Sequence, residues 1–111
     1  MLDNDALGMV WEGGQITGPH GATARPSPAQ ARILAVLAGV PGQWVDRSRL
    51  WDAMTRLPNG KPSDCPPGAN TFNVQMNGLR RALRRAEAPV QISMRYDGHW
   101  NRKYALHPVS D

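Results

Sequence analysis

The most regular hydrophobic pattern in the chain runs from residue 70 to residue 86. Phe72, Met76, Leu79, Leu83 and Ala86 follow one another at intervals of four and three residues, which places them on one face of an α-helix. The opposite face carries Asn70, Val74, Asn77, Arg81 and Arg84, flanked by Asn73, Arg80 and Arg85. The pattern therefore predicts a helix over residues 70–86, capped by its first asparagine, with a buried apolar stripe and an exposed polar and basic face.

Two shorter helices are predicted before this one. The segment Ser27–Gln30 indicates a helix start, because its serine can cap the helix, its proline suits the first helical position and its glutamine completes a capping box. Apolar residues at helical spacing continue this helix as far as Gly39. A second helix is expected over about residues 47–55, capped by Asp46. The proline- and glycine-rich residues 57–69 predict a loop before the third helix.

Both ends of the chain predict β-structure. Residues 8–25 contain short apolar stretches separated by glycine-rich turns, the first at Gly13-Gly14, which is typical of a small antiparallel sheet. Residues 90–106 alternate apolar and polar side chains on either side of Asp97-Gly98, a strong hairpin pattern. The predicted fold class is therefore α+β, with three helices in residues 27–86 between an N-terminal sheet and a C-terminal hairpin.

The alternation also predicts the length of the hairpin loop. The large apolar residues of this segment share even-numbered positions, namely Val90, Ile92, Met94, Tyr96, Trp100, Tyr104 and Leu106. A two-residue loop would pair even with odd positions and split this set between two faces. We therefore expect a loop of three or five residues, or a bulge, with a tip of Asp97-Gly98-His99 or slightly wider. The same parity places Arg95 on the other face of the hairpin.

The basic charge is concentrated in the C-terminal part of the chain. The 111 residues are enough for one domain over residues 1–111, and their net charge is +4. Residues 70–111 hold seven arginines and lysines against three acids, whereas residues 1–69 hold six of each. This asymmetry predicts that the third helix and the hairpin contact a polyanionic partner.

The sequence contains no pattern typical of catalysis, metal binding or membrane insertion. Cys65 is the only cysteine, so no internal disulfide can form, and the histidines do not have the spacing of zinc ligands. There is no glycine-rich phosphate loop, and no apolar run approaches the roughly 20 residues of a membrane helix. We therefore expect no enzyme activity, no cofactor, no metal and no membrane partner. The lone thiol fits a cytoplasmic location.

The third helix carries a Thr-x-x-Val-x-apolar-x-x-Leu-Arg-basic-Ala-Leu pattern over residues 71–83, and this resembles the recognition helix of the OmpR/PhoB-type winged helix-turn-helix DNA-binding domain. Pro26–Leu37 is similar to the first helix of that family, and Ser93–Gly98 followed by Tyr104–Leu106 is similar to its wing. Strands before the first helix are also a mark of the family. The resemblance covers residues 8–106 and implies a bacterial or phage transcription regulator, here without a receiver domain.

On this basis we expect sequence-specific binding of double-stranded DNA. Helix 70–86 would lie in the major groove, with its arginines on phosphates and its asparagines and Val74 on base edges, while wing 90–106 would contact phosphates or the minor groove. The resemblance implies that Thr71 and Ser93 also contact phosphates. It leaves RNA polymerase, another regulator or a second copy of the chain on DNA as further partners. The expected DNA-binding residues are Asn70, Thr71, Asn73, Val74, Asn77, Arg80, Arg81, Arg84, Arg85, Ser93, Arg95 and Arg102.

A second interpretation stays open, in which a winged helix has lost DNA binding and serves as a protein-interaction module, either an anti-repressor or an RNA polymerase-binding adaptor. Asn77 and Gly78 stand where the family typically has basic residues, and Trp100 lies near the hairpin tip. A glycine inside a helix either permits close approach of another segment or is merely tolerated. The other tryptophans are expected to be core or sheet anchors, and they are Trp11, Trp44 and Trp51.

Overall fold

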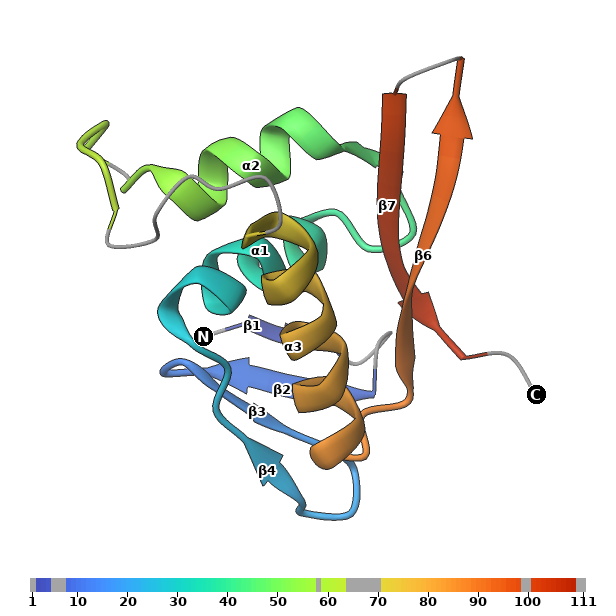
Figure 1. Cartoon of the computed structure of the whole chain (residues 1–111). Coiled ribbons are helices and arrows are strands. Elements are labelled where there is room, and N and C mark those ends of the chain that lie inside the picture. Colours follow the sequence, from blue (N-terminus) through green and yellow to red (C-terminus); the bar gives the residue numbers. More distant parts are fainter. Residues whose placement is uncertain (1, 5–7, 58, 64–70, 99–100, 110–111) are drawn as a thin grey trace.

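The computed structural model describes residues 2–4, 8–57, 59–63, 71–98 and 101–109 (Figure 1). Its elements are β1 (Leu2–Asn4), β2 (Met9–Glu12), β3 (Gln15–Thr17), β4 (Thr23–Ala24), α1 (Pro28–Gly39), β5 (Val45–Asp46), α2 (Arg47–Thr55), α3 (Thr71–Arg85), β6 (Val90–Asp97) and β7 (Asn101–Pro108). The predicted α+β class is confirmed, with an N-terminal antiparallel sheet, three helices and a C-terminal hairpin packed against the helices. Among the described residues, no helix combines the length and apolarity needed to cross a bilayer.

The N-terminal sheet contains four antiparallel strands in the order β1-β2-β3-β4. The predicted hairpin is confirmed as β2 and β3. Gly13 and Gly14 form its turn with φ angles of 61° and 76°, the left-handed conformation that a tight hairpin turn requires at both positions. The strand expected after the second turn is confirmed as β4. The sequence does not predict β1, because three residues are too few to show an alternating pattern and only their pairing with β2 defines them.

α1 begins at the predicted capping box. The Ser27 hydroxyl accepts a hydrogen bond from the Gln30 amide at 3.3 Å, and the Gln30 side chain accepts one from the Ser27 amide at 3.1 Å. The same two side chains reach α3, because Ser27 Oγ and Gln30 Nε2 donate to Gln75 Oε1 at 3.2 and 3.0 Å. A small polar network therefore joins the start of α1 to α3.

Gly78 lies where α1 and α3 meet. A Cβ atom at this position would collide with the side-chain amide of Gln30, which the capping box and Gln75 already hold in place. Of the two roles that the sequence leaves open for this glycine, close approach of another segment is therefore correct. Gly78 faces α1, and a basic side chain at this position would collide with Gln30 of that helix.

The apolar stripe of α3 forms the centre of the core. The five predicted stripe residues are at most 3 % exposed, and Ala82 joins them at 4 %. α1 contributes Ile33, Leu34 and Leu37, which are all fully buried. The helix covers Thr71–Arg85, close to the predicted 70–86. Asn70, the expected cap, lies outside the described residues.

Phe72 joins α2, α3 and the C-terminal sheet. Its side chain is fully buried, and its ring centroid lies 5.5 Å from that of Tyr104 on β7. The Arg47 guanidinium, at the start of α2, lies 4.7 Å from the centroid of the Phe72 ring and 5.4 Å from that of Trp51. Such cation–π contacts gain strength when they are desolvated. The first turn of α3 is therefore held from both α2 and β7.

The other end of α3 docks on the N-terminal sheet. Glu87 adopts a left-handed φ of 53°, its amide donates to the Arg84 carbonyl, and the Ala88 amide donates to the Leu83 carbonyl, each at 3.0 Å. This is the Schellman arrangement that ends many helices. Gly18, in the turn between β3 and β4, is buried so closely against Ala86 that a Cβ atom there would collide with the Ala86 carbonyl oxygen. Both ends of α3 are thus fixed.

The C-terminal sheet has the strand order β5-β7-β6. Met94 pairs with Tyr104 and Asp97 with Asn101, so that three residues, 98–100, connect the strands. The odd-numbered loop expected from the alternation is confirmed. Asp97, expected in the tip, still pairs within the ladder, and the hairpin runs to Pro108 instead of ending at residue 106. His99, the last residue of the expected tip, lies outside the described residues.

A pair of substitutions tests the helical phase of α3. Replacing the fully buried Leu79 by alanine should lower the free energy of unfolding by about 2–5 kcal/mol, because it leaves a cavity in the core. Replacing the exposed Asn77 by alanine should change it by less than about 0.5 kcal/mol. Urea denaturation of both variants measures the difference, and equal losses would contradict the phase.

A double-mutant cycle tests the contact between Gly78 and Gln30. Gly78→Ala should destabilise the wild-type protein by about 1 kcal/mol, because displacing the amide loses two hydrogen bonds worth about 1 kcal/mol each and alanine recovers only about 1 kcal/mol of helix propensity. In a Gln30→Ala background the same substitution should stabilise the protein. Additive effects in thermal or urea unfolding would mean that the two residues are not coupled.

Candidate nucleic-acid interface

α3 presents its asparagine and arginine side chains to solvent, as the helical phase predicts. The exposed predicted residues of this helix are Asn73, Val74, Asn77, Arg81, Arg84 and Arg85. Within the part of the chain that the structure describes, these arginines form neither an ion pair nor a side-chain hydrogen bond. Their guanidinium groups are therefore hydrated and available to an anionic ligand.

A cleft of about 280 Å³ lies between α3 and the wing, the hairpin of β6 and β7. Its walls are formed by Asn73, Met76, Asn77 and Arg80 of α3 and by Met94, Arg102 and Tyr104 of the wing. Four of the predicted site residues, two with amide and two with guanidinium groups, thus converge here. The apolar wall comes from three residues that the sequence places in the hydrophobic pattern, so the cleft offers both hydrogen-bonding groups and apolar surface.

Arg80 differs from the other arginines of α3. It is half-buried, and its Nη2 atom donates a hydrogen bond to the Ile92 carbonyl on β6 at 3.2 Å. It also lines a second, smaller cleft of about 190 Å³ between the C-terminal half of α3 and β6. Arg80, expected from the sequence to contact a DNA phosphate, therefore connects α3 to the wing in this structure.

The wing is buried at its base and exposed toward its tip. Val90 and Ile92 are each 7 % exposed, whereas Met94 is 42 % and Tyr96 63 % exposed, although all four alternate on one face. In Figure 1 the ends of β6 and β7 that are far from β1–β4 extend beyond the helices, so the apolar face is largely exposed there. Of the exposed apolar side chains, Met94 lines the cleft beside α3, while Val74 on α3 is itself 57 % exposed.

Arg95 lies on the opposite face of the wing from this apolar set, and its guanidinium lies 4.6 Å from the centroid of the Trp44 ring. Trp44 precedes β5 and is 38 % exposed. Trp44 is therefore not part of the core, and its ring packs instead against Arg95 of the C-terminal sheet. Trp11 is buried and Trp51 packs half-buried against the core, as expected.

Lys103 connects the wing to the start of α2. Its ammonium lies 2.8 Å from Asp97 Oδ2 and 3.8 Å from Asp46 Oδ1. The hydrogen bond that Lys103 donates holds the pKa of the Asp97 carboxyl below its ordinary value, and the same bond raises the pKa of Lys103. Asp46 occupies the predicted cap position of α2, yet its side chain does not bond to the first turn and instead faces this lysine.

Ser93, expected on a phosphate, has a partner within the wing. Its Oγ atom lies 2.6 Å from His107 Nε2, and His107 Nδ1 lies 3.2 Å from the Pro108 carbonyl oxygen. A proton on Nδ1 would leave Nε2 to accept from the serine hydroxyl. The sequence does not predict this pair. Ser93 pairs with Ala105 in the ladder, so His107, two residues further along β7, is its diagonal neighbour.

Two further predicted residues have described positions. Arg102 is half-buried in the cleft, and Thr71 is the half-buried first residue of α3. Asn70 and Trp100 lie outside the described residues. The structure thus brings eight of the twelve predicted residues onto the outer face of α3 and the adjoining cleft, and these are Asn73, Val74, Asn77, Arg80, Arg81, Arg84, Arg85 and Arg102.

No family model, curated protein or solved structure matches the chain. The topology itself is consistent with an OmpR-like winged helix, because a small antiparallel sheet, three helices and a C-terminal hairpin follow one another in that order.

Lys103→Met should raise the pKa of Asp97 toward its ordinary value of about 3.9. Because the pKa of Asp97 is lowered in the folded state, the ion pair contributes stability above the unfolded pKa, and this contribution is lost as the pH falls through the folded pKa. Carbon-detected NMR titration of the Asp97 carboxyl in both proteins measures the change. Arg84→Met removes the same charge outside the wing and should leave the lowered pKa in place; indistinguishable titrations of Lys103→Met and wild type would contradict the assignment.

Proposed function

We propose that this chain is an OmpR/PhoB-type winged-helix regulator that binds double-stranded DNA in the cytoplasm. The observation that carries the proposal is the exposed, acid-free face of α3, with three arginines and two asparagines, adjoining a cleft whose other wall is a projecting hairpin. The surplus of positive charge in residues 70–111 supports a polyanionic partner for this region.

The shape and chemistry of α3 suit the major groove. A helix of 15 residues is about 22 Å long, and the major groove is wide enough to admit an α-helix. Asn73 and Asn77 can each make paired hydrogen bonds to an adenine edge, and Val74 can contact a thymine methyl group. Asn73 and Asn77 are one helical turn apart on α3, so we propose that they read neighbouring base pairs.

The arginines would then have two different roles. Arg81, Arg84 and Arg85 would neutralise phosphates and supply most of the affinity. Arg80, which bonds to the Ile92 carbonyl, would set the angle between α3 and the wing. Arg102, in the cleft, is the wing residue best placed to contact DNA beside the helix.

A second candidate function is favoured by one observation, the exposure of apolar side chains on α3 and on the wing. Val74, Met94 and Tyr96 are each more than two-fifths exposed, and exposed aromatic and methionine side chains are enriched at protein interfaces. A winged helix that has lost DNA binding would use this surface to bind another protein. It would then act either as an anti-repressor or as an adaptor that binds RNA polymerase.

The DNA-binding proposal predicts a steep dependence on salt. The logarithm of the association constant should fall with the logarithm of salt concentration with a slope of about −3 to −6, since each neutralised phosphate contributes about −0.9. Replacing Arg81 and Arg84 together by alanine should flatten that slope by about 2. Fluorescence anisotropy with DNA obtained by random-site selection measures both values.

Arg49→Ala with Arg56→Ala is the matched control, because it removes the same charge from α2. Its salt slope should equal that of the wild type. Undetectable affinity for duplex DNA at low salt would overturn the proposal in favour of the protein-interaction function. In that case Tyr96→Ala should abolish partner binding without lowering the melting temperature.

A further inference from the structure

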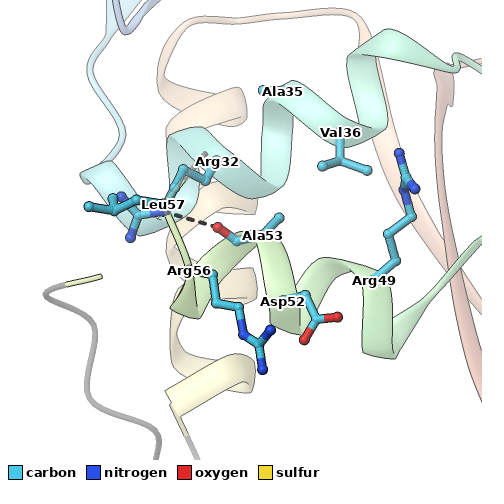
Figure 2. A pocket seen from close by; sticks show the side chains of 8 residues that line it. All are labelled: Arg32, Ala35, Val36, Arg49, Asp52, Ala53, Arg56 and Leu57. Carbon is cyan, nitrogen blue, oxygen red and sulfur yellow. Dashed lines mark hydrogen bonds between the residues drawn. The ribbon is translucent and has the colours of Figure 1, made fainter. Parts of the chain in front are cut away.

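A groove of about 510 Å³ runs between α1 and α2 (Figure 2). All its lining residues come from these two helices and from Arg56 and Leu57, which follow α2. None of them belongs to α3, β6 or β7, so the groove is separate from the candidate DNA-binding surface. It is also larger than either cleft beside the wing.

Hydrogen bonds hold the groove in shape at the C-terminal end of α2. Arg32 of α1 donates from Nε to the Ala53 carbonyl at 3.1 Å and from Nη2 to the Met54 carbonyl at 2.9 Å, which ties α1 to the last turn of α2. Beyond that turn, the Leu57 amide donates to the Lys61 carbonyl at 2.8 Å and the Gly60 amide to the Leu57 carbonyl at 2.9 Å. The site is therefore preformed, which lowers the entropic cost of binding.

The floor of the groove is apolar. Figure 2 shows Val36 projecting from α1 toward α2, and Ala53 facing it from α2. Leu57 is 36 % exposed, although the turn that holds it gives it a fixed position. Half of the lining side chains are alanine, valine or leucine, so a ligand must present apolar side chains of its own to fill this space.

The rim of the groove is predominantly positive. Arg49 on α2 and Arg56, the residue that caps the C-terminus of α2, are exposed, and Asp52 lies between them in the sequence. Neither arginine forms an ion pair or a side-chain hydrogen bond with any residue that the structure describes. The rim thus carries two hydrated cations over an apolar floor, and the single acid does not neutralise both.

We propose that this groove binds an acidic amphipathic helix of a partner protein. Leucine-like anchors at helical spacing would fill the apolar floor, and carboxylates beside them would pair with Arg49 and Arg56. A nucleic acid fits the same groove poorly, because its phosphates would leave the apolar floor unfilled. The proposal does not depend on DNA binding by α3, because the two surfaces share no residue.

A designed peptide tests the proposal on the full chain. The probe is a fluorescent amphipathic helical peptide with leucines at positions i, i+3, i+4 and i+7 and glutamates on the flanking positions. We expect saturable binding by fluorescence anisotropy, with amide chemical-shift changes concentrated at Val36, Ala53 and Leu57. A scrambled peptide of identical composition should bind at least about tenfold more weakly, because its anchors no longer share a face.

Charge reversal separates this groove from the DNA-binding surface. Arg49→Glu with Arg56→Glu should weaken peptide binding by about tenfold or more. Arg81→Glu with Arg84→Glu, the matched control, should leave peptide binding unchanged while reducing binding to duplex DNA. Leu57→Ser should weaken peptide binding without changing the salt dependence of the complex, because it removes an apolar contact only.

Three results would overturn the proposal. One is equal binding of the ordered and scrambled peptides, which would indicate charge attraction alone. Another is a set of chemical-shift changes that falls on α3 and the wing. The third is duplex DNA that shifts the resonances of Val36 and Leu57 and loses this effect in the Arg49→Glu, Arg56→Glu variant, which would make the groove a second nucleic-acid surface.

Discussion

The orientation of α3 depends on the packing of one buried ring. Phe72 contacts Tyr104 of the wing and the Arg47 guanidinium of α2, so three elements meet at a single side chain. Tyr104 in turn pairs with Met94 and lines the cleft between helix and wing. Because the ring has no space to move, a rotation of α3 would disturb α2 and the wing together, and the polar face of the helix keeps a defined angle to the hairpin.

This rigid junction separates positioning from binding among the arginines. Arg80 and Arg32 donate to backbone carbonyls of neighbouring elements and thereby hold helix to strand and helix to helix. Arg81 on α3 and Arg49 on α2 lie instead on exposed faces with no protein partner among the described residues. The molecule consequently has two basic surfaces with different chemistry, one with amide groups and suited to base edges, the other with an apolar floor and suited to a helix.

Much of the fold could be predicted from local pattern. The three helices, the capping box at Ser27, the turn at Gly13-Gly14 and the odd-numbered hairpin loop follow from periodicity, backbone preference and parity, which act over a few residues. The exposed face of α3 follows from the same helical phase, so Asn73 and Asn77 could be identified as candidate contacts before any tertiary contact was known.

What the sequence by itself determined is therefore which side of each helix is buried. Only the tertiary structure decided which elements lie against those sides. Arg80 and Arg81 are adjacent arginines, yet a carbonyl of β6 lies beside only the first. Trp44 is left at the surface beneath Arg95, and the α1–α2 groove exists because two helices meet at a particular separation. Such contacts join residues far apart in the chain, and their formation depends on the packing of the whole core, which no local pattern specifies.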